Sequence, residues 1–82
     1  MVEFVLFSRS TCPLCEAMED ELSTYIEKYS ITVSRRYIDN DAELERQYGT
    51  KVPVLTLQQK TLCEYFLDPE ALLDAIVKAE ER

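Results

Sequence analysis

The fold is decided by residues 4–15, which read Phe4-Val5-Leu6-Phe7-Ser8-Arg9-Ser10-Thr11-Cys12-Pro13-Leu14-Cys15. An apolar run dense in aromatic and branched residues predicts a buried strand over Glu3–Phe7. A polar connection follows it. Pro13 then favours the start of a helix, because the first helical position needs no N–H donor. The sequence therefore predicts that Cys12 and Cys15 lie at the junction of a strand and a helix.

This junction is a place where a cysteine becomes reactive. Cys12 falls at the expected cap of the helix, and Cys15 lies one turn further on. A helix N-terminus carries about half a positive charge and several unpaired N–H groups. These groups favour the thiolate, which is the form that attacks disulfides. Arg9 adds favourable charge, whereas three acidic side chains early in the helix oppose it, and each such surface effect is small. We predict that Cys12 attacks and that Cys15 resolves the mixed disulfide.

Other interpretations of the cysteines stay open at this point. Cys12 and Cys15 have the spacing of half a zinc site, but a structural zinc site takes four Cys or His ligands. The chain has three cysteines and no histidine, so we predict no metal. An inert buried pair is the second alternative, which the position after a strand disfavours. The third cysteine, Cys63, is either a small buried hydrophobe or a secondary thiol near the active site.

The helix that begins at Pro13 has apolar residues at helical spacing. We expect one buried stripe, formed by Leu14, Met18, Leu22, Tyr25, Ile26 and Tyr29. A strand over Thr32–Ile38 follows, and the order strand, helix, strand predicts a right-handed parallel crossover. A short helix is expected over Asp41–Tyr48, with Asn40 as its N-cap and Gly49 as its left-handed C-terminal cap.

The last third of the chain predicts two strands and a helix. The strands are expected over Val54–Leu57 and Thr61–Phe66, joined by a turn that lacks glycine. Asp68 caps the last helix and Pro69 opens it. Its apolar face is expected to contain Leu72, Leu73, Ile76 and Val77. The order βαβ-α-ββα predicts an α/β domain over residues 1–82, with a four-stranded mixed sheet and three helices on its two faces.

Charge and cysteine usage exclude several classes of protein. The net charge is -7, from 16 acidic and 9 basic residues, which disfavours nucleic acid as a partner. The N-terminal apolar run is too short to cross a membrane and lacks the basic start of a signal peptide. An odd number of cysteines does not suggest a secreted disulfide framework. We therefore expect a cytoplasmic monomer that binds neither nucleic acid nor membranes.

Two segments of the chain together resemble the glutaredoxins. Residues 7–15 resemble the glutaredoxin active-site segment. A second hallmark, a Val-Pro before the third strand, is matched by Tyr48-Gly49-Thr50-Lys51-Val52-Pro53-Val54-Leu55. The resemblance covers almost the whole chain and is closest to short bacterial glutaredoxin-like proteins. It implies a thioredoxin-like (glutaredoxin-type) fold with strand order 2-1-3-4.

The resemblance also implies roles for individual residues. Cys12 would be the attacking and Cys15 the resolving cysteine of a redox-active disulfide. Pro53 matches the family's cis-proline, which presents the backbone of the preceding residue to substrate. The implied substrate-binding residues are Arg9, Pro13, Leu14, Val52 and Pro53. One departure concerns glutathione: the place of the family's Gly-Gly is held by Cys63-Glu64. We therefore expect no bound cofactor, and only weak binding of glutathione.

The predicted function is reversible thiol–disulfide exchange on proteins or small thiols. The electron donor would be glutathione or a protein of the thioredoxin-reductase type. One alternative is a redox-sensing module, in which the disulfide state changes affinity for a partner without turnover. A further alternative is carriage of an iron–sulfur cluster with glutathione. Family members with that role usually lack the proline-containing pair found here.

Overall fold

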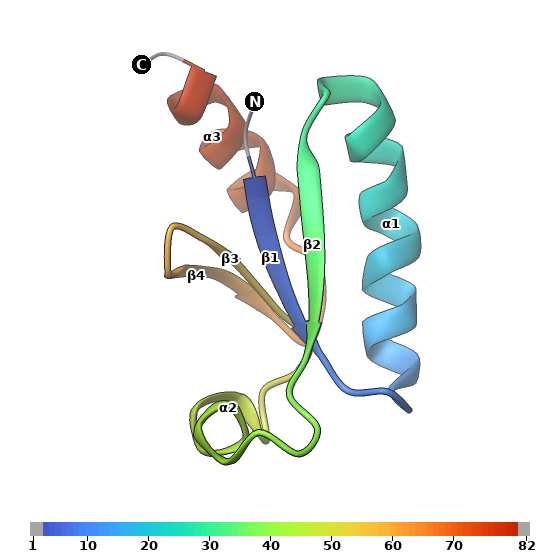
Figure 1. The fold of residues 1–82 in the computed structure, drawn as a ribbon. Coiled ribbons are helices and arrows are strands. Elements are labelled where there is room, and N and C mark those ends of the chain that lie inside the picture. Colours follow the sequence, from blue (N-terminus) through green and yellow to red (C-terminus); the bar gives the residue numbers. More distant parts are fainter. Residues whose placement is uncertain (1–2, 81–82) are drawn as a thin grey trace.

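The computed structural model describes residues 3–80, so the first two and last two residues of the predicted domain lie outside the described residues. The elements, in chain order, are β1 (Glu3–Ser8), α1 (Pro13–Tyr29), β2 (Thr32–Tyr37), α2 (Ala42–Tyr48), β3 (Val54–Leu57), β4 (Lys60–Glu64) and α3 (Pro69–Glu80) (Figure 1). This order confirms the predicted βαβ-α-ββα arrangement. Between residues 3 and 80, no helix is long and apolar enough to span a membrane.

The four strands form one mixed sheet in the order β2-β1-β3-β4, as predicted. β1 runs parallel to β2 and antiparallel to β3, and β3 pairs antiparallel with β4. Phe7 lies opposite Val54 in the register of β1 and β3. The end of β1 and the start of β3 are therefore neighbours. Figure 1 shows α2 beyond this end of the sheet, where α1 also starts.

The core lies between the sheet and the helices α1 and α3. It contains Phe4 and Leu6 of β1, Met18 and Leu22 of α1, and Leu72 and Ile76 of α3, all buried. The apolar face predicted for α3 is wrong at its end, because Val77 is 55% exposed. Val77 directly follows Ile76 and is therefore rotated by about 100° around the helix, away from the core.

The stripe predicted for α1 is also corrected at two positions. Leu14 and Ile26 are 40% and 37% exposed. The stripe that packs against the core consists of Cys15, Met18, Leu22, Tyr25 and Tyr29. Its spacing of three and four residues in alternation follows one side of a helix. The buried stripe therefore starts at Cys15, and Leu14 lies outside it.

The strand boundaries differ from the predicted ones by one or two residues. β2 ends at Tyr37, although the next amide, that of Ile38, still donates to the oxygen of Ser8 at 2.9 Å. β4 ends at Glu64 because the following residue, Tyr65, has a left-handed backbone with φ 68°. The hairpin turn has positive φ at both central residues, Gln58 and Gln59, as a type I′ turn requires, although neither is glycine.

The predicted N-cap of α2 is wrong, whereas Gly49 is the C-cap as predicted but lacks the predicted left-handed backbone. The N-cap is Asp41, whose Oδ1 accepts a hydrogen bond from the amide of Leu44 at 3.1 Å. Asn40 lies before it with a left-handed φ of 65°. Gly49 is right-handed, with φ -50°, and its amide continues the helical pattern to the oxygen of Glu45. A Cβ at Gly49 would lie 2.3 Å from that oxygen, so close packing, not a left-handed turn, requires the glycine.

The corrected stripe of α1 generates a stability prediction. Replacing the buried Leu22 by alanine is expected to lower the free energy of unfolding by about 2–5 kcal/mol, because it leaves a cavity. The matched change Ile26→Ala, one turn away, is expected to cost under about 1 kcal/mol because Ile26 is partly exposed. Urea unfolding measures both. Equal losses in the two variants would contradict the corrected stripe.

Candidate functional site

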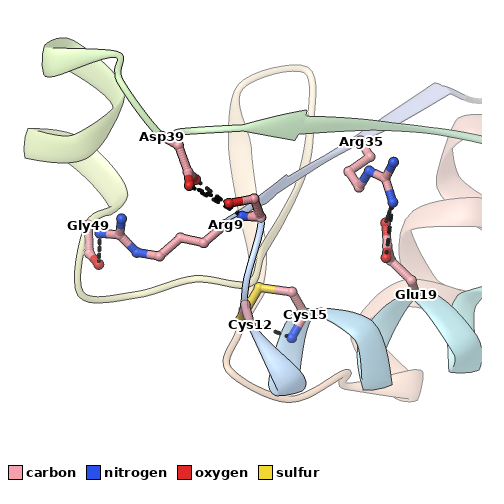
Figure 2. Close-up of a disulfide and its surroundings, with 8 residues drawn as sticks. Arg9, Cys12, Cys15, Glu19, Arg35, Asp39 and Gly49 are labelled. Carbon is pink, nitrogen blue, oxygen red and sulfur yellow. Dashed lines mark hydrogen bonds and ion pairs between the residues drawn. A yellow bond between two sulfur atoms is a disulfide. The ribbon is translucent and has the colours of Figure 1, made fainter.

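The site is built around a disulfide between Cys12 and Cys15 at the start of α1 (Figure 2). Their Cα atoms are 5.2 Å apart. Cys12 is the N-cap of α1, with an extended backbone, and Pro13 follows at the first helical position. The amide of Cys15 donates a hydrogen bond to the Sγ atom of Cys12 at 3.1 Å. The sulfur of Cys12 thus occupies the place of the side-chain oxygen that usually caps a helix.

Cys12 and Cys15 differ in exposure. Cys15 is 2% exposed, because it is the first member of the buried stripe of α1. Cys12 is half-buried, and the intervening residues Pro13 and Leu14 are exposed. The helix therefore presents Cys12 to the surface and turns Cys15 toward the core. Cys12 is therefore the more accessible of the two cysteines, and the exposed apolar side chains of Pro13 and Leu14 lie beside it.

The loop before Cys12 is held by hydrogen bonds to the end of β2. The backbone amide and the hydroxyl of Ser10 both donate to the carboxylate of Asp39, the hydroxyl at 2.7 Å. These hydrogen bonds hold the pKa of Asp39 below its usual range, and the charge of Arg9 acts in the same direction. Asp39 therefore fastens the loop while it is ionised.

Arg9 points away from the disulfide, toward α2 (Figure 2). Its guanidinium donates to both carboxylate oxygens of Glu45 and, at 2.8 Å, to the backbone oxygen of Gly49. The hydrogen bond with Glu45 raises the pKa of Arg9 further above its already high value. The sequence predicts Arg9 as a substrate contact and as a charge that favours the thiolate. In the structure its charge is balanced by Glu45 instead.

Pro53 lies at the same end of the sheet as the disulfide. The Val52–Pro53 peptide bond is cis. Pro53 is buried, and its backbone oxygen accepts a hydrogen bond from the amide of Tyr65 at 2.9 Å. Val54 follows in β3, beside the last residues of β1. The fold thus brings Val52 and Pro53 to the end of the sheet that carries Cys12.

Tyr65 and Phe66 lie near this end of the sheet, and neither is among the site residues predicted from the sequence. Tyr65 is 41% exposed, and its hydroxyl donates to the backbone oxygen of Thr50 at 2.6 Å. The next side chain, Phe66, is 70% exposed. Tyr65 also has a left-handed backbone, and it directly follows the Cys63-Glu64 pair that stands in place of the family's glycines. No local feature of the sequence marks Tyr65 for this conformation.

Cys63 is a half-buried residue of β4 that packs against the core. Burial raises the pKa of its thiol, and the charge of Asp68 adds to this effect, while the amide of Asp68 opposes it. These features agree with a small packed hydrophobe. Residues 3–80 contain no group of three or more His, Cys, Asp or Glu side chains placed to hold a metal ion.

Comparison with known proteins finds a matching family and several similar structures. Residues 3–77 match a family described as "Glutaredoxin-like domain (DUF836)". A Nitrosomonas europaea protein solved by NMR is 33% identical, with a TM-score of 0.81, over 90% of this chain and 89% of that one. A structural genomics target from X. campestris is 30% identical, with a TM-score of 0.64, over 88% and 96%. No curated protein matches the chain.

The thioredoxin-like fold is confirmed by a more distant comparison. The germline-specific thioredoxin Deadhead from Drosophila melanogaster is 24% identical, with a TM-score of 0.59, over 94% of this chain and 79% of that one. The predicted glutaredoxin-like resemblance is confirmed as well. Together with the linked Cys12–Cys15 pair, these findings support a thiol–disulfide redox function.

The carboxylate of Asp39 predicts how stability depends on pH. Because its pKa is depressed in the folded state, Asp39 stabilises the protein above its unfolded pKa of about 3.9. That contribution is lost as the pH falls through the lower, folded value. The difference in unfolding free energy between the parent and Asp39→Asn is therefore expected to be constant at neutral pH and to shrink below about pH 4.

Urea unfolding of both proteins across a pH series measures this difference. Ser10→Ala removes the hydroxyl donor. Its difference in unfolding free energy from the parent is expected to shrink below about pH 4 in the same way, but by a smaller amount. A difference between parent and Asp39→Asn that persists unchanged at pH 2 would contradict the account of Asp39.

Proposed function

Because this chain belongs to the glutaredoxin-like domain family, we propose that it is an oxidoreductase that exchanges a Cys12/Cys15 dithiol with substrate disulfides. The observation that carries the proposal is the position of the Cys12 sulfur at the N-terminus of α1. There it accepts a hydrogen bond from the amide of Cys15 at 3.1 Å. The same donor and the helix dipole stabilise a negative charge on that sulfur once the disulfide is reduced.

The proposed reaction has two steps. The thiolate of Cys12 attacks one sulfur of the substrate disulfide, forms a mixed disulfide and releases the other substrate sulfur as a thiolate. Cys15 then loses its proton, attacks the Cys12 sulfur and releases the second substrate thiolate. Two electrons pass to the substrate, and the Cys12–Cys15 disulfide forms. The burial of Cys15 supports this division of roles, because an external disulfide reaches Cys12 first.

The surface around Cys12 supports polypeptide disulfides as the substrate class. Pro13 and Leu14 are exposed beside it and offer apolar contacts. The backbone of Val52, ahead of the cis-proline, would pair with an extended substrate chain, as the family resemblance implies. Arg9 is paired with Glu45, so an anionic ligand would compete with that carboxylate for the guanidinium. A second dithiol protein, such as one of the thioredoxin-reductase type, is the donor that we propose for re-reduction.

The two cysteine variants test the proposed roles. Cys12→Ser is expected to abolish exchange with a peptide disulfide, since the attacking sulfur is absent. Cys15→Ser is expected to accumulate a mixed disulfide through Cys12 and to release it slowly. Mass spectrometry of the trapped adduct and a turnover assay with catalytic amounts of protein measure these outcomes.

Three results would count against the proposal. Rapid adduct formation by Cys12→Ser, with an inert Cys15→Ser, would reverse the roles. Failure of catalytic amounts of the parent to accelerate peptide disulfide reduction would favour the redox-sensing module instead. Full turnover by Cys63→Ala is expected, and its loss would mean that the third thiol takes part in the exchange.

Weak binding of glutathione is the second expectation of this proposal. The family's glutathione site has Gly-Gly where this chain has the side chains of Cys63 and Glu64. The end of glutathione that binds at this site in the family carries a carboxylate, which has the same charge as Glu64. Two like charges about 4 Å apart at an effective dielectric of 20 repel by roughly 4 kcal/mol. Even a quarter of that repulsion weakens binding about fivefold. Glu64→Gln is therefore expected to bind glutathione about fivefold more tightly than the parent.

Titration calorimetry on the Cys15→Ser background measures this binding. Glu3→Gln makes the same change of charge at the opposite end of β1 and serves as the matched control, with no expected gain. Tight binding by the parent that is unchanged by Glu64→Gln would show that these side chains do not hinder glutathione.

A further inference from the structure

Arg9 joins two segments of the site that are far apart in the sequence. It lies three residues before Cys12, and it binds Glu45 and Gly49, with Gly49 four residues before Pro53. All three of its contacts lie 36 or 40 residues away along the chain. Figure 2 shows the side chain reaching from the loop before the disulfide to Gly49 at the end of α2. The guanidinium is therefore a bridge between the cysteine loop and the proline segment.

Helix α2 is joined to the cysteine loop by this bridge. It buries no side chain, so the hydrophobic effect holds it only weakly to the sheet. The ring of Tyr48 stacks on Phe7 of β1, with 4.4 Å between ring centroids, and gives one apolar contact. The bidentate pair of Arg9 with Glu45 gives the polar contact. A bidentate guanidinium pair fixes orientation as well as distance.

The segment after α2 is held at several points along its length. Arg9 binds the oxygen of Gly49, and the hydroxyl of Tyr65 binds the oxygen of Thr50. The amide of Tyr65 binds the oxygen of Pro53. Val52, whose backbone would meet the substrate, lies between these anchors. Loss of the Arg9 anchor would remove the link from this segment to the cysteine loop, while the contacts at Thr50 and Pro53 remain.

We propose that Arg9 is a positioning residue that sets the backbone around Val52 relative to the Cys12 sulfur through its bridge to Glu45 and Gly49. The proposal rests on the exchange reaction proposed above. It assigns Arg9 a role different from a free charge that stabilises the thiolate. Arg9 and Glu45 are both about one-third exposed, so the ion pair alone contributes little to global stability. Its effect is local, on the alignment of a bound polypeptide.

Three variants separate positioning from charge. Arg9→Met removes the guanidinium and keeps an unbranched stem. Glu45→Gln leaves the charge of Arg9 in place but weakens the bridge. Arg9→Lys keeps the charge but offers a single ammonium, which cannot reproduce the planar fork. Arg46→Met is the matched control, because Arg46 is an arginine of α2 that also forms an ion pair, with Glu43, and both of those side chains are mostly exposed.

The readout is the rate of exchange with a peptide disulfide and with a small aromatic disulfide, each as a function of pH. Positioning predicts that all three variants slow the peptide reaction by about three- to tenfold. It predicts a change of less than about twofold for the small disulfide, which does not use the backbone of Val52. The pH at which the rate is half-maximal should stay constant. The double variant Arg9→Met with Glu45→Gln should be no slower than the slower single variant.

If Arg9 acted through its charge alone, Glu45→Gln and Arg9→Met would change the exchange rate in opposite directions, and that result would overturn the proposal. In that case Glu45→Gln frees a positive charge, speeds attack and lowers the half-maximal pH, while Arg9→Met slows attack on both disulfides. Equal rates in parent and variants would overturn it as well. A parent without exchange activity would instead refute the proposed function. Amide NMR shifts of Lys51 and Val52, expected to change in each variant but not in Arg46→Met, report the bridge independently of activity.

Discussion

The hydrogen bond from the Cys15 amide to the Cys12 sulfur depends on how α1 is held against the sheet. Cys15 belongs to the buried stripe that continues through Met18 and Leu22. Packing of that stripe turns Cys15 toward the core and leaves Cys12 at the surface, as the cap of the helix. The hydrophobic core therefore decides which of the two cysteines is exposed. The same packing directs the amide of Cys15 toward the sulfur that would carry negative charge in the proposed exchange.

Most of the fold follows from short-range patterns in the sequence. The order of elements, the helix start at Pro13 and the cap at Asp68 depend on residues within a few positions of one another, and the structure contains them. The errors arise where neighbouring residues compete for one role. Leu14 and Cys15 are both apolar and adjacent, and Cys15 is the one that lies on the same side of α1 as the buried Met18 and Leu22. Asn40 and Asp41 compete in the same way for the cap of α2.

The site could be predicted in part for the same reason. Cys12, Cys15 and Pro53 belong to local motifs whose spacing is visible in the chain. The partners of Arg9 are not visible, because Glu45 and Gly49 lie 36 and 40 residues away and the sequence offers 16 carboxylates as candidates. Tyr65 was missed because its left-handed backbone is set by the hairpin and by its bond to Pro53, whereas a tyrosine carries no local signal for that conformation.

The most direct test is the rate at which iodoacetamide alkylates each cysteine of the reduced protein from pH 4 to pH 10, followed by mass spectrometry. The account predicts that Cys12 reacts first and reaches half its maximal rate well below the value of about 8.5 at which an ordinary cysteine ionises. Cys15 and Cys63, both turned toward the core, should react slowly at neutral pH. A Cys12 that titrates like a free cysteine, or a faster Cys15, would contradict the claim that the start of α1 creates the nucleophile.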